Sequence, residues 1–285
     1  MKKSVDYAKR IKVYPLSQAG NPPATTFTDA KDVVFDSTIK YDSNFFKSLD
    51  RIIQHEPWLS RDRVMIDQLK SLGIEKGKQF APSLAVTKQL EAGVEEGREW
   101  LEARYEAGMI PFYGKSRWNY AGSPELVKSA QAGYDEPEAY PVGLRGVAYS
   151  YAFVGLKRMG TGQFYLISIK DKEGSDFDGA KTYRLKVPAD VPVQQYWSLT
   201  AYDRETHALI RNMDRASRSS QIVDLKKNVD GTVDLYLGPK APKGSEANWI
   251  PTDPRRKFEV MFRLYGPTKA LFGKTWKLPD LELVE

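Results

Sequence analysis

The residues whose types and spacing could do chemistry lie mainly in one run, from 193 to 203. Aromatic and hydroxyl side chains alternate there with apolar ones and end in a charged pair: Tyr196, Ser198, Thr200 and Tyr202, then Asp203 and Arg204. Such a set could line a pocket for a sugar, a hydroxylated ring or another amphiphilic ligand, because ligand sites combine apolar walls with a few placed polar groups. In the alternative, a helical layer covers this face and the tyrosines pack there with their hydroxyls satisfied.

Four more candidates surround the apolar run from 258 to 264. Arg263 and Tyr265 belong to the exposed face of the strand predicted there, and Asn248 and Trp249 to the loop that enters it. A tryptophan in an ordered loop usually fills a gap, but in a sandwich it could also cap the mouth of a ligand site. The sequence therefore predicts eight ligand-binding residues: Tyr196, Tyr202, Asp203, Arg204, Asn248, Trp249, Arg263 and Tyr265.

Acid–base chemistry has fewer candidates. His207 follows a predicted strand beside acidic residues and could be a base. No nucleophile or second histidine is near it in sequence, so we expect an exposed loop histidine instead. His55, at a predicted helix end, is expected to be structural, since a cation suits the helix dipole there. Paired-carboxylate chemistry needs two acids about 5–10 Å apart in a cleft, and the sequence offers, without pairing any, Asp203, Glu205, Asp214 and Glu259.

Signatures of other chemistries are missing from the sequence. There is no Gly-rich phosphate loop, no G-x-S-x-G elbow and no His-Glu-x-x-His motif. The lack of cysteine excludes disulfides, thiolate catalysis and Cys-bound zinc, and two histidines leave little room for an imidazole-rich metal site. Residues 171–179 lack the regular acidic spacing of a calcium loop and are predicted to form a polar β-turn loop. We therefore expect no metal and no cofactor.

Composition limits the partners. The chain has 285 residues, 41% of them hydrophobic, which suits one large domain or two of ordinary size. Its net charge of +6 comes from Lys and Arg that are interleaved with acids, so a nucleic-acid partner is not expected. No stretch approaches the roughly 20 apolar residues that span a bilayer. The basic N-terminus has no apolar region after it, so we expect no signal peptide and a chain that is either cytoplasmic or trimmed.

The elements that must position these residues begin with helices. Residues 21–26 are predicted to be extended, and 33–35 to form a short strand. Asp42 or Ser43 should cap a helix that Pro57 ends. Ser60 is a candidate cap for a second helix, with Gly73 at its C-terminal end. A longer amphipathic helix should follow Pro82, because its apolar residues recur every three or four positions: Val86, Leu90, Val94, Leu101 and Tyr105.

From about residue 146 the pattern changes to strands. Dense apolar runs at 147–154 and 164–169 predict buried strands, and strict alternation predicts a half-exposed strand at 183–187. The pair Asp230-Gly231 between 221–225 and 232–237 predicts a hairpin. Another strand should bury four alternating residues: Phe258, Val260, Phe262 and Leu264. Residues 267–273 should form a helical turn with Pro267 at its first position.

This order predicts an α+β fold, in which a small helical layer is followed by an antiparallel β-sandwich that is jelly-roll-like. The predicted divisions are an extended N-terminal segment (1–40), a helical region (41–110) and the sandwich domain (111–285).

Several blocks of the sequence point to a family. They are Tyr41-Asp42, residues 45–51, Glu56-Pro57-Trp58-Leu59, residues 73–77, residues 196–203, Leu225-Lys226-Lys227-Asn228, residues 247–251 and residues 263–267. Together they resemble the bacterial family of unknown function built from tandem DUF-1254 and DUF-1214 modules. The C-terminal blocks are similar to the second module, and the helical segment to the region between the modules.

The resemblance implies a β-rich, exported protein, hence a periplasmic or extracellular location, and it assigns no residue a catalytic role. Members of the family typically begin with an export signal and an additional N-terminal module, which we expect this chain to lack. If that module covers part of the sandwich, an exposed apolar patch should remain and favour a homo-oligomer.

Three function classes therefore stay open. The leading prediction is a ligand-binding or envelope-associated sandwich module for a carbohydrate or an amphiphilic small molecule. The alternatives are a hydrolase or lyase that uses paired carboxylates, and a structural or assembly module.

Overall fold

The computed structural model describes residues 2–34, 36, 38–135, 138, 141–152 and 162–284. The chain divides into two units, Met1–Ser37 and Thr38–Glu285. The first unit contains helix α1 (Lys2–Ala8) and a 3₁₀ turn (Leu16–Gln18), and its described residues are nearly all exposed. The short strand predicted at 33–35 is wrong, because Val33 and Val34 lie exposed outside any strand; Phe35 lies outside the described residues.

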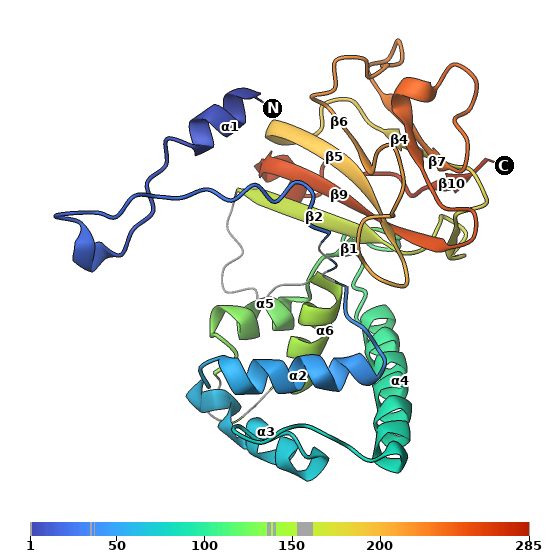
Figure 1. Cartoon of the computed structure of the whole chain (residues 1–285). Coiled ribbons are helices and arrows are strands. Elements are labelled where there is room, and N and C mark those ends of the chain that lie inside the picture. Colours follow the sequence, from blue (N-terminus) through green and yellow to red (C-terminus); the bar gives the residue numbers. More distant parts are fainter. Residues whose placement is uncertain are drawn as a thin grey trace. The chain divides into compact units, whose positions relative to one another are not determined.

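The second unit begins with the helical layer (Figure 1). Its helices are α2 (Ser43–His55), α3 (Arg63–Gln68), α4 (Leu84–Ala107), α5 (Pro124–Gln131) and α6 (Val142–Ala152). Asp42 caps α2 as predicted, because its side chain accepts the backbone N–H of Asn44 at 2.8 Å. Gly73 has the positive φ of 83° that a C-terminal cap requires. Ser60 does not cap α3 but opens a 3₁₀ turn before it.

The layer has its own core. Helices α2 and α4 bury apolar residues against each other and against the turn that follows α3: Phe46, Ile53, Ile74, Leu90 and Val94. The apolar stripe predicted for the helix after Pro82 supplies two of these, Leu90 and Val94, and reaches the buried Tyr105 at the other end of α4.

Helix α6 corrects the strand predicted at 147–154. The structure has a helix over Val142–Ala152, and residues 153–161 lie outside the described part of the chain. A dense apolar run does not by itself distinguish a buried strand from a buried helix. Two glycines allow α6 to approach α4 closely: a Cβ on Gly143 would lie 3.1 Å from the Trp100 ring, and one on Gly146 3.3 Å from Leu101.

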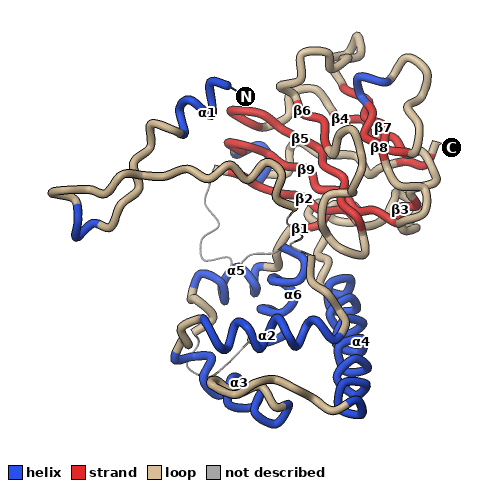
Figure 2. The backbone as a smooth tube through the Cα atoms, viewed as in Figure 1, coloured by secondary structure: helices blue, strands red, loops and turns tan. Residues whose placement is uncertain are grey.

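The C-terminal part forms two sheets, which Figure 2 shows in red. The first has the order β1-β2-β9-β5-β6, and β3 also pairs with β9: β1 (Asn119–Tyr120), β2 (Gln163–Ser168), β3 (Phe177–Asp178), β5 (Val193–Asp203), β6 (Ser217–Ser219) and β9 (Lys257–Pro267). The second has the order β10-β4-β7-β8: β4 (Tyr183–Val187), β7 (Val233–Gly238), β8 (Trp249–Pro251) and β10 (Glu282–Leu283). Strand pairs are antiparallel except β7 with β8, which is parallel.

The main core lies between the two sheets and confirms the predicted α+β class with a β-rich C-terminal region. The alternating residues of β9 are all buried in it, as predicted: Phe258, Val260, Phe262 and Leu264. Tyr183, Leu185 and Val187 of β4 meet them from the second sheet. Trp197 stacks on Phe262 at 5.4 Å between ring centroids, so β5 and β9 share one apolar face.

Two local predictions in this part are wrong. Residues 221–225 form no strand, and Val223 is fully exposed, so the predicted hairpin does not exist. Strand β7 pairs instead with β4 and β8, which occupy both of its edges. Pro267 is the last residue of β9, and the short helix α7 (Lys269–Phe272) follows Thr268, so proline is not its first residue.

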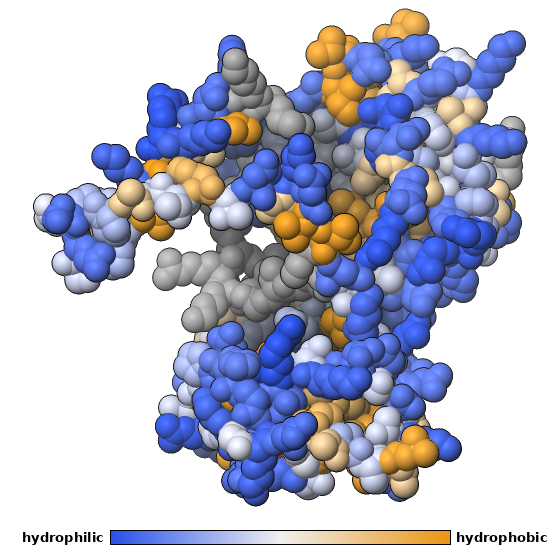
Figure 3. All heavy atoms as spheres, viewed as in Figure 1, coloured by the Kyte–Doolittle hydropathy of each residue, from blue (hydrophilic) through white to orange (hydrophobic). Residues whose placement is uncertain are grey.

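Helices α4 and α6 cover part of the other face of the first sheet. Tyr105 packs with Ile167 of β2, and Val147, Tyr151 and Met261 of β9 pack against them. On the surface, apolar side chains gather in separate patches among hydrophilic ones (Figure 3). None of the described helices is both long and apolar enough to cross a bilayer.

Candidate functional site

The predicted ligand residues fall into three groups, of which the first is a tyrosine–arginine face on β2, β9 and β5. The rings of Tyr196 and Tyr265 stack with centroids 4.1 Å apart. Arg263 lies over the rings of Tyr165 and Tyr202, at 5.4 and 5.8 Å, and donates a hydrogen bond to the hydroxyl of Tyr202. All five residues are half-buried. The face therefore carries aromatic and cationic groups that are largely engaged with one another.

The second group lies at the other sheet, where Asn248 ends a 3₁₀ turn and Trp249 begins β8. The amide oxygen of Asn248 accepts the N–H of Lys226 at 2.8 Å, and its amide nitrogen donates to the carbonyls of Lys226 and Asp234. The indole N–H of Trp249 donates to the carbonyl of Gly238 at 2.9 Å. These polar groups bind backbone atoms of the sandwich and fasten the loop that precedes β7.

The third group lies where β5 ends, and it builds a tight turn. Asp203 accepts hydrogen bonds from the backbone of Glu205 and of Thr206, and from the Thr206 hydroxyl. Its carboxylate also pairs with the guanidinium of Arg256. Burial opposes the charge of Asp203, but these hydrogen bonds outweigh it and lower the pKa of the carboxyl. The turn presents His207 in the left-handed region, with φ 53°.

His207 corrects the expectation of an exposed loop histidine, because only 7% of its surface is exposed. Its Nδ1 lies 2.9 Å from Oε1 of Glu259 on β9, which is also buried. Its Nε2 lies 3.7 Å from Oε2 of Glu102 on α4. The imidazole is thus held between two carboxylates, one from the sheet and one from the helical layer.

Two tyrosines and an arginine complete this network. The hydroxyl of Tyr105 donates to Oε2 of Glu259 at 2.9 Å, and that of Tyr151 to Oε2 of Glu102 at 3.2 Å. The two tyrosine rings stack 4.1 Å apart, and each presents a T-shaped contact to His207. Helices α4 and α6 thus close over the imidazole, which explains its burial.

Arg204 supplies the second positive charge of the network. Its guanidinium pairs with Glu102, lies 3.1 Å from Glu106 and 3.9 Å from Glu259, and stacks over Tyr105 at 5.1 Å. Burial acts against its charge, but Glu259 and Glu102 outweigh it and raise the pKa of the guanidinium. The predicted site residue Arg204 therefore ties the end of β5 to helix α4.

The electrostatics of the network favour a charged imidazole. Burial opposes protonation of His207, but its hydrogen bonds with Glu102 and Glu259 outweigh burial and raise the pKa of the imidazole. Burial acts to raise the pKa of Glu102, but the interactions of this carboxyl with His207 and Arg204 outweigh burial and lower its pKa. Burial and the charge of Glu259 raise the pKa of Tyr105 well above its usual range, which keeps the phenol protonated as a donor.

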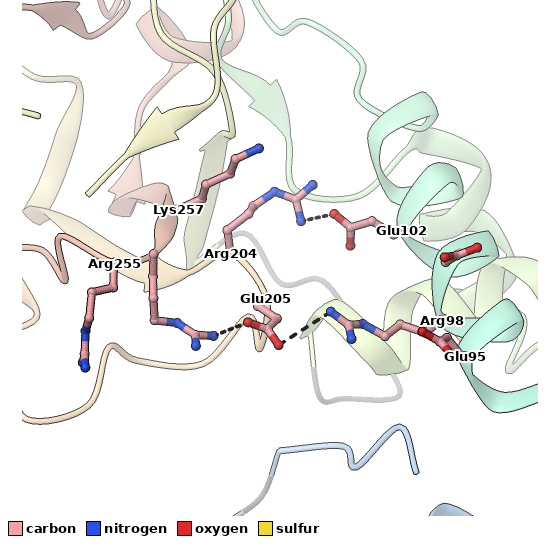
Figure 4. A pocket seen from close by; sticks show the side chains of 9 residues that line it. Glu95, Arg98, Glu102, Arg204, Glu205, Arg255 and Lys257 are labelled. Atoms are coloured by element: carbon pink, nitrogen blue, oxygen red, sulfur yellow. Dashed lines mark hydrogen bonds and ion pairs between the residues drawn. The ribbon is translucent and has the colours of Figure 1, made fainter. Parts of the chain in front are cut away.

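Three cavities adjoin the network. A cavity of about 460 Å³ lies between α4 and the ends of β5 and β9, and its lining residues include Glu102 and Arg204 (Figure 4). A second cavity, of about 610 Å³, lies among α4, α5 and α6, and Tyr105 lines it. A third, of about 240 Å³, is lined by His207 and by residues 38–42. Of the eight predicted ligand residues, Arg204 alone lines one of these three cavities.

Sequence reasoning missed Glu102, Tyr105 and Tyr151. One signal for these residues was available on α4. Its apolar stripe ends at Tyr105, and the acids Glu102 and Glu106 lie on either side of this tyrosine in the sequence. The pattern of this helix does not predict that Glu102 and Tyr105 lie against His207, which is about 100 positions later in the chain. Among the described residues no cluster of His, Asp or Glu has the geometry to hold a metal ion.

Comparison with known proteins identifies the segment that carries the sandwich part of this site, whereas Glu102, Tyr105 and Tyr151 lie before it. Residues 162–269 match the family described as "Protein of unknown function (DUF1214)". The match runs from the start of β2 to the first residue of α7 and includes Arg204, His207 and Glu259. It confirms the DUF-1214 part of the resemblance, whereas the tandem arrangement with DUF-1254 stays a prediction. No curated protein matches the chain.

Two solved structures are similar to parts or all of the chain. The VPA0106 protein from Vibrio parahaemolyticus is 20% identical, and the match covers 100% of this chain and 65% of that one, with a TM-score of 0.47. A putative uncharacterized protein from Burkholderia cenocepacia is 12% identical, with 79% and 49% covered and a TM-score of 0.33. The chain thus spans less than two thirds of the length of either protein.

Proposed function

We propose that this protein binds an amphiphilic small molecule in the cavity of about 610 Å³ among α4, α5 and α6. The observation that carries the proposal is the character of this cavity. Its volume lies within the range of small-molecule sites, and its walls are mainly apolar with a few polar groups. A sugar with an alkyl or aromatic substituent has the same division into polar and apolar parts.

Apolar residues from the sheet, from α6 and from the segment after α4 line the cavity. Ile167 of the sheet and Val147 of α6 line it together with Met109, which is half-buried in the same cluster. Ile110 and Val142 also line it and remain 40% and 48% exposed. Burying these side chains under an apolar ligand group would gain free energy of about 25 cal/mol per Å² removed from water.

The polar groups are few and placed on helices. Arg104 stacks over Trp100 at 5.2 Å at the end of α4, and Glu125 stands in the first turn of α5. Both line the cavity together with the hydroxyl-bearing Ser123. One cation, one carboxylate and three hydroxyl-bearing residues (Tyr105, Tyr120 and Ser123) suit a neutral, hydroxylated head group, which can both donate and accept hydrogen bonds.

The test is calorimetric titration with octyl glucoside below its micelle concentration, with glucose as the ligand that lacks the apolar chain. Saturable binding of octyl glucoside and none of glucose is expected. The variant Ile110→Glu should weaken binding by about tenfold or more, because the ligand chain would then bury a charge. Leu84→Glu, on an exposed residue of α4 that does not line the cavity, is the matched control. Equal affinities of the two variants would sink the proposal.

A second candidate function is proton-transfer catalysis, and the pair His207–Glu259 is the observation that favours it. A carboxylate at 2.9 Å fixes one ring nitrogen, while the ring itself lines a cavity of about 240 Å³. A lyase acting on a carbohydrate acid needs such a group to move a proton. Incubation with polyuronates should then yield unsaturated products, by ultraviolet absorbance, that His207→Asn abolishes and Glu96→Gln leaves unchanged. If the unaltered protein yields no such products, this result counts against proton-transfer catalysis.

A further inference from the structure

The cavity of about 460 Å³ at the end of β5 has two walls of opposite charge (Figure 4). One wall is a single face of α4, where acidic residues follow each other at helical spacing: Glu95, Glu99 and Glu102. The other wall belongs to the sandwich and is mainly basic, with Glu205 as its one acid: Arg204, Arg255, Arg256 and Lys257. Each wall thus carries an excess of one sign of charge, and Arg98 on α4 and Glu205 on the sandwich are the opposite charges within them.

Two ion pairs connect the walls. Arg204 pairs with Glu102, and Glu205 of the sandwich lies 3.7 Å from Arg98 of α4 (Figure 4). Arg98 also stacks over the ring of Tyr41 at 5.8 Å. These pairs hold α4 opposite the strand ends and fix the spacing of the walls.

The acidic wall retains two carboxylates without a countercharge. Among the residues that the structure describes, neither Glu95 nor Glu99 has an ion-pair or hydrogen-bond partner. Like charges four positions apart on one helix destabilise it by a few tenths of a kcal/mol, so a bound cation would relieve an existing repulsion.

Two residues of the basic wall are held by ion pairs with acids of the sandwich itself. Arg255 makes a bidentate pair with Asp253, and Nζ of Lys257 lies 2.7 Å from Asp176. Their side chains nonetheless stay exposed, at 84% and 63%, so their remaining donors face solvent. A guanidinium has five N–H donors, and a carboxylate of a ligand can take those that Asp253 does not use.

We propose that this cavity binds a small zwitterion of the amino acid class, with its ammonium toward Glu95 and Glu99 and its carboxylate toward Arg255 and Lys257. A ligand with one sign of charge would meet repulsion from one of the two walls. A zwitterion that spans them meets attraction from both. The ligand class differs from that of the apolar cavity, and the two sites share no lining residue.

Three ligands of five carbons test this arrangement: 5-aminopentanoate, the dianion glutarate and the dication 1,5-diaminopentane. The calorimetric titration is done at about 0.15 M salt, where exposed charges are screened beyond about 8 Å. Under this condition, binding at a specific site is distinguished from non-specific electrostatic attraction to the surface. Only 5-aminopentanoate is expected to bind saturably. Binding of either single-sign ligand as tightly as the zwitterion overturns the proposal.

Variants assign the binding to the cavity. The double variant Glu95→Gln with Glu99→Gln should lower the affinity for 5-aminopentanoate by about tenfold or more, because it removes two charged hydrogen-bond acceptors. Glu91→Gln with Glu96→Gln removes the same charge from the same helix outside the cavity and should change affinity less than about twofold. Equal losses in the two double variants would contradict the assignment. All four positions are exposed, so both double variants should fold, and Arg104→Gln should leave this binding unchanged.

Discussion

Nδ1 of His207 lies 2.9 Å from Oε1 of Glu259, and both side chains are buried although 52 positions separate them in the chain. The pair joins the turn after β5 to the start of β9. On its other side the imidazole faces Glu102 and Tyr105 of α4 and Tyr151 of α6, with Arg204 beside it. His207 therefore connects the sandwich with the helical layer through charge, in addition to the ion pairs of Arg204 with Glu102 and Glu106.

This connection should make stability depend on pH in a defined direction. The folded-state pKa of His207 is raised above its ordinary value of 6.5, so protonated His207 stabilises the fold fully below that value. The contribution is lost as the pH rises through the raised folded-state pKa. The free energy of unfolding of the unaltered protein should therefore exceed that of His207→Asn most on the acid side, by about 1–3 kcal/mol.

Urea unfolding of both proteins between about pH 5 and pH 9 measures this difference. Asparagine is the suitable replacement because it tolerates the left-handed backbone of this position, φ 53°, and does not titrate. The range starts above the region in which Glu102, whose pKa is lowered, gains its proton. A difference that stays constant or grows with pH would show that the imidazole is neutral in the folded protein.

Tyr105 and His207 should be energetically coupled, because each contacts a different oxygen of Glu259. Tyr105→Phe removes one donor to this buried carboxylate and should cost about 1–3 kcal/mol of unfolding free energy. With His207→Asn in the same chain, the combined loss should differ from the sum of the two by about 0.5 kcal/mol or more. Additive losses in a double-mutant cycle would mean that the two contacts do not share a network.

The sequence predicts well what depends on local pattern. The alternation in β9 and β4 and the caps at Asp42 and Gly73 are properties of adjacent residues, and the structure confirms them. The run at 147–154 misleads because apolar density is common to buried helices and strands. Whether it forms a helix is decided by its neighbour α4, which the glycines of α6 allow to approach.

The candidate site is less predictable, because its residues come from elements far apart in the chain. Arg204 stood out as a charged residue at a strand end. His207 was expected to be exposed, since nothing next to it in sequence shows that α4 and α6 close over it. Tyr105 and Glu259 are 154 positions apart, and their contact follows from how the helical layer packs on the first sheet. Local patterns do not encode such a contact.

Gly179 should tolerate no side chain. A Cβ there would lie 2.0 Å from the carbonyl oxygen of Asp253 and 2.6 Å from that of Arg256, and both are backbone atoms that cannot rotate away. Gly179→Ala should therefore cost about 1–3 kcal/mol or more. Gly93→Ala is the matched control, because nothing lies within 4 Å of its Cβ position in α4 and the change should stabilise the helix by about 0.5–1 kcal/mol. Thermal unfolding of both variants should show shifts of opposite sign.

Asn248 should matter for stability, whatever the ligand of this protein is. Its buried side chain makes three hydrogen bonds with backbone groups of Lys226 and Asp234, so Asn248→Ala leaves an N–H and two carbonyls without that partner. The expected loss is about 2–3 kcal/mol of unfolding free energy. Asn44→Ala, at an exposed position of α2 whose amide contacts only Lys47 at 3.4 Å, should cost less than about 0.5 kcal/mol. If denaturant unfolding shows no difference between the two variants, the loop before β7 is fastened by other contacts, and Asn248 returns to the set of candidate ligand residues.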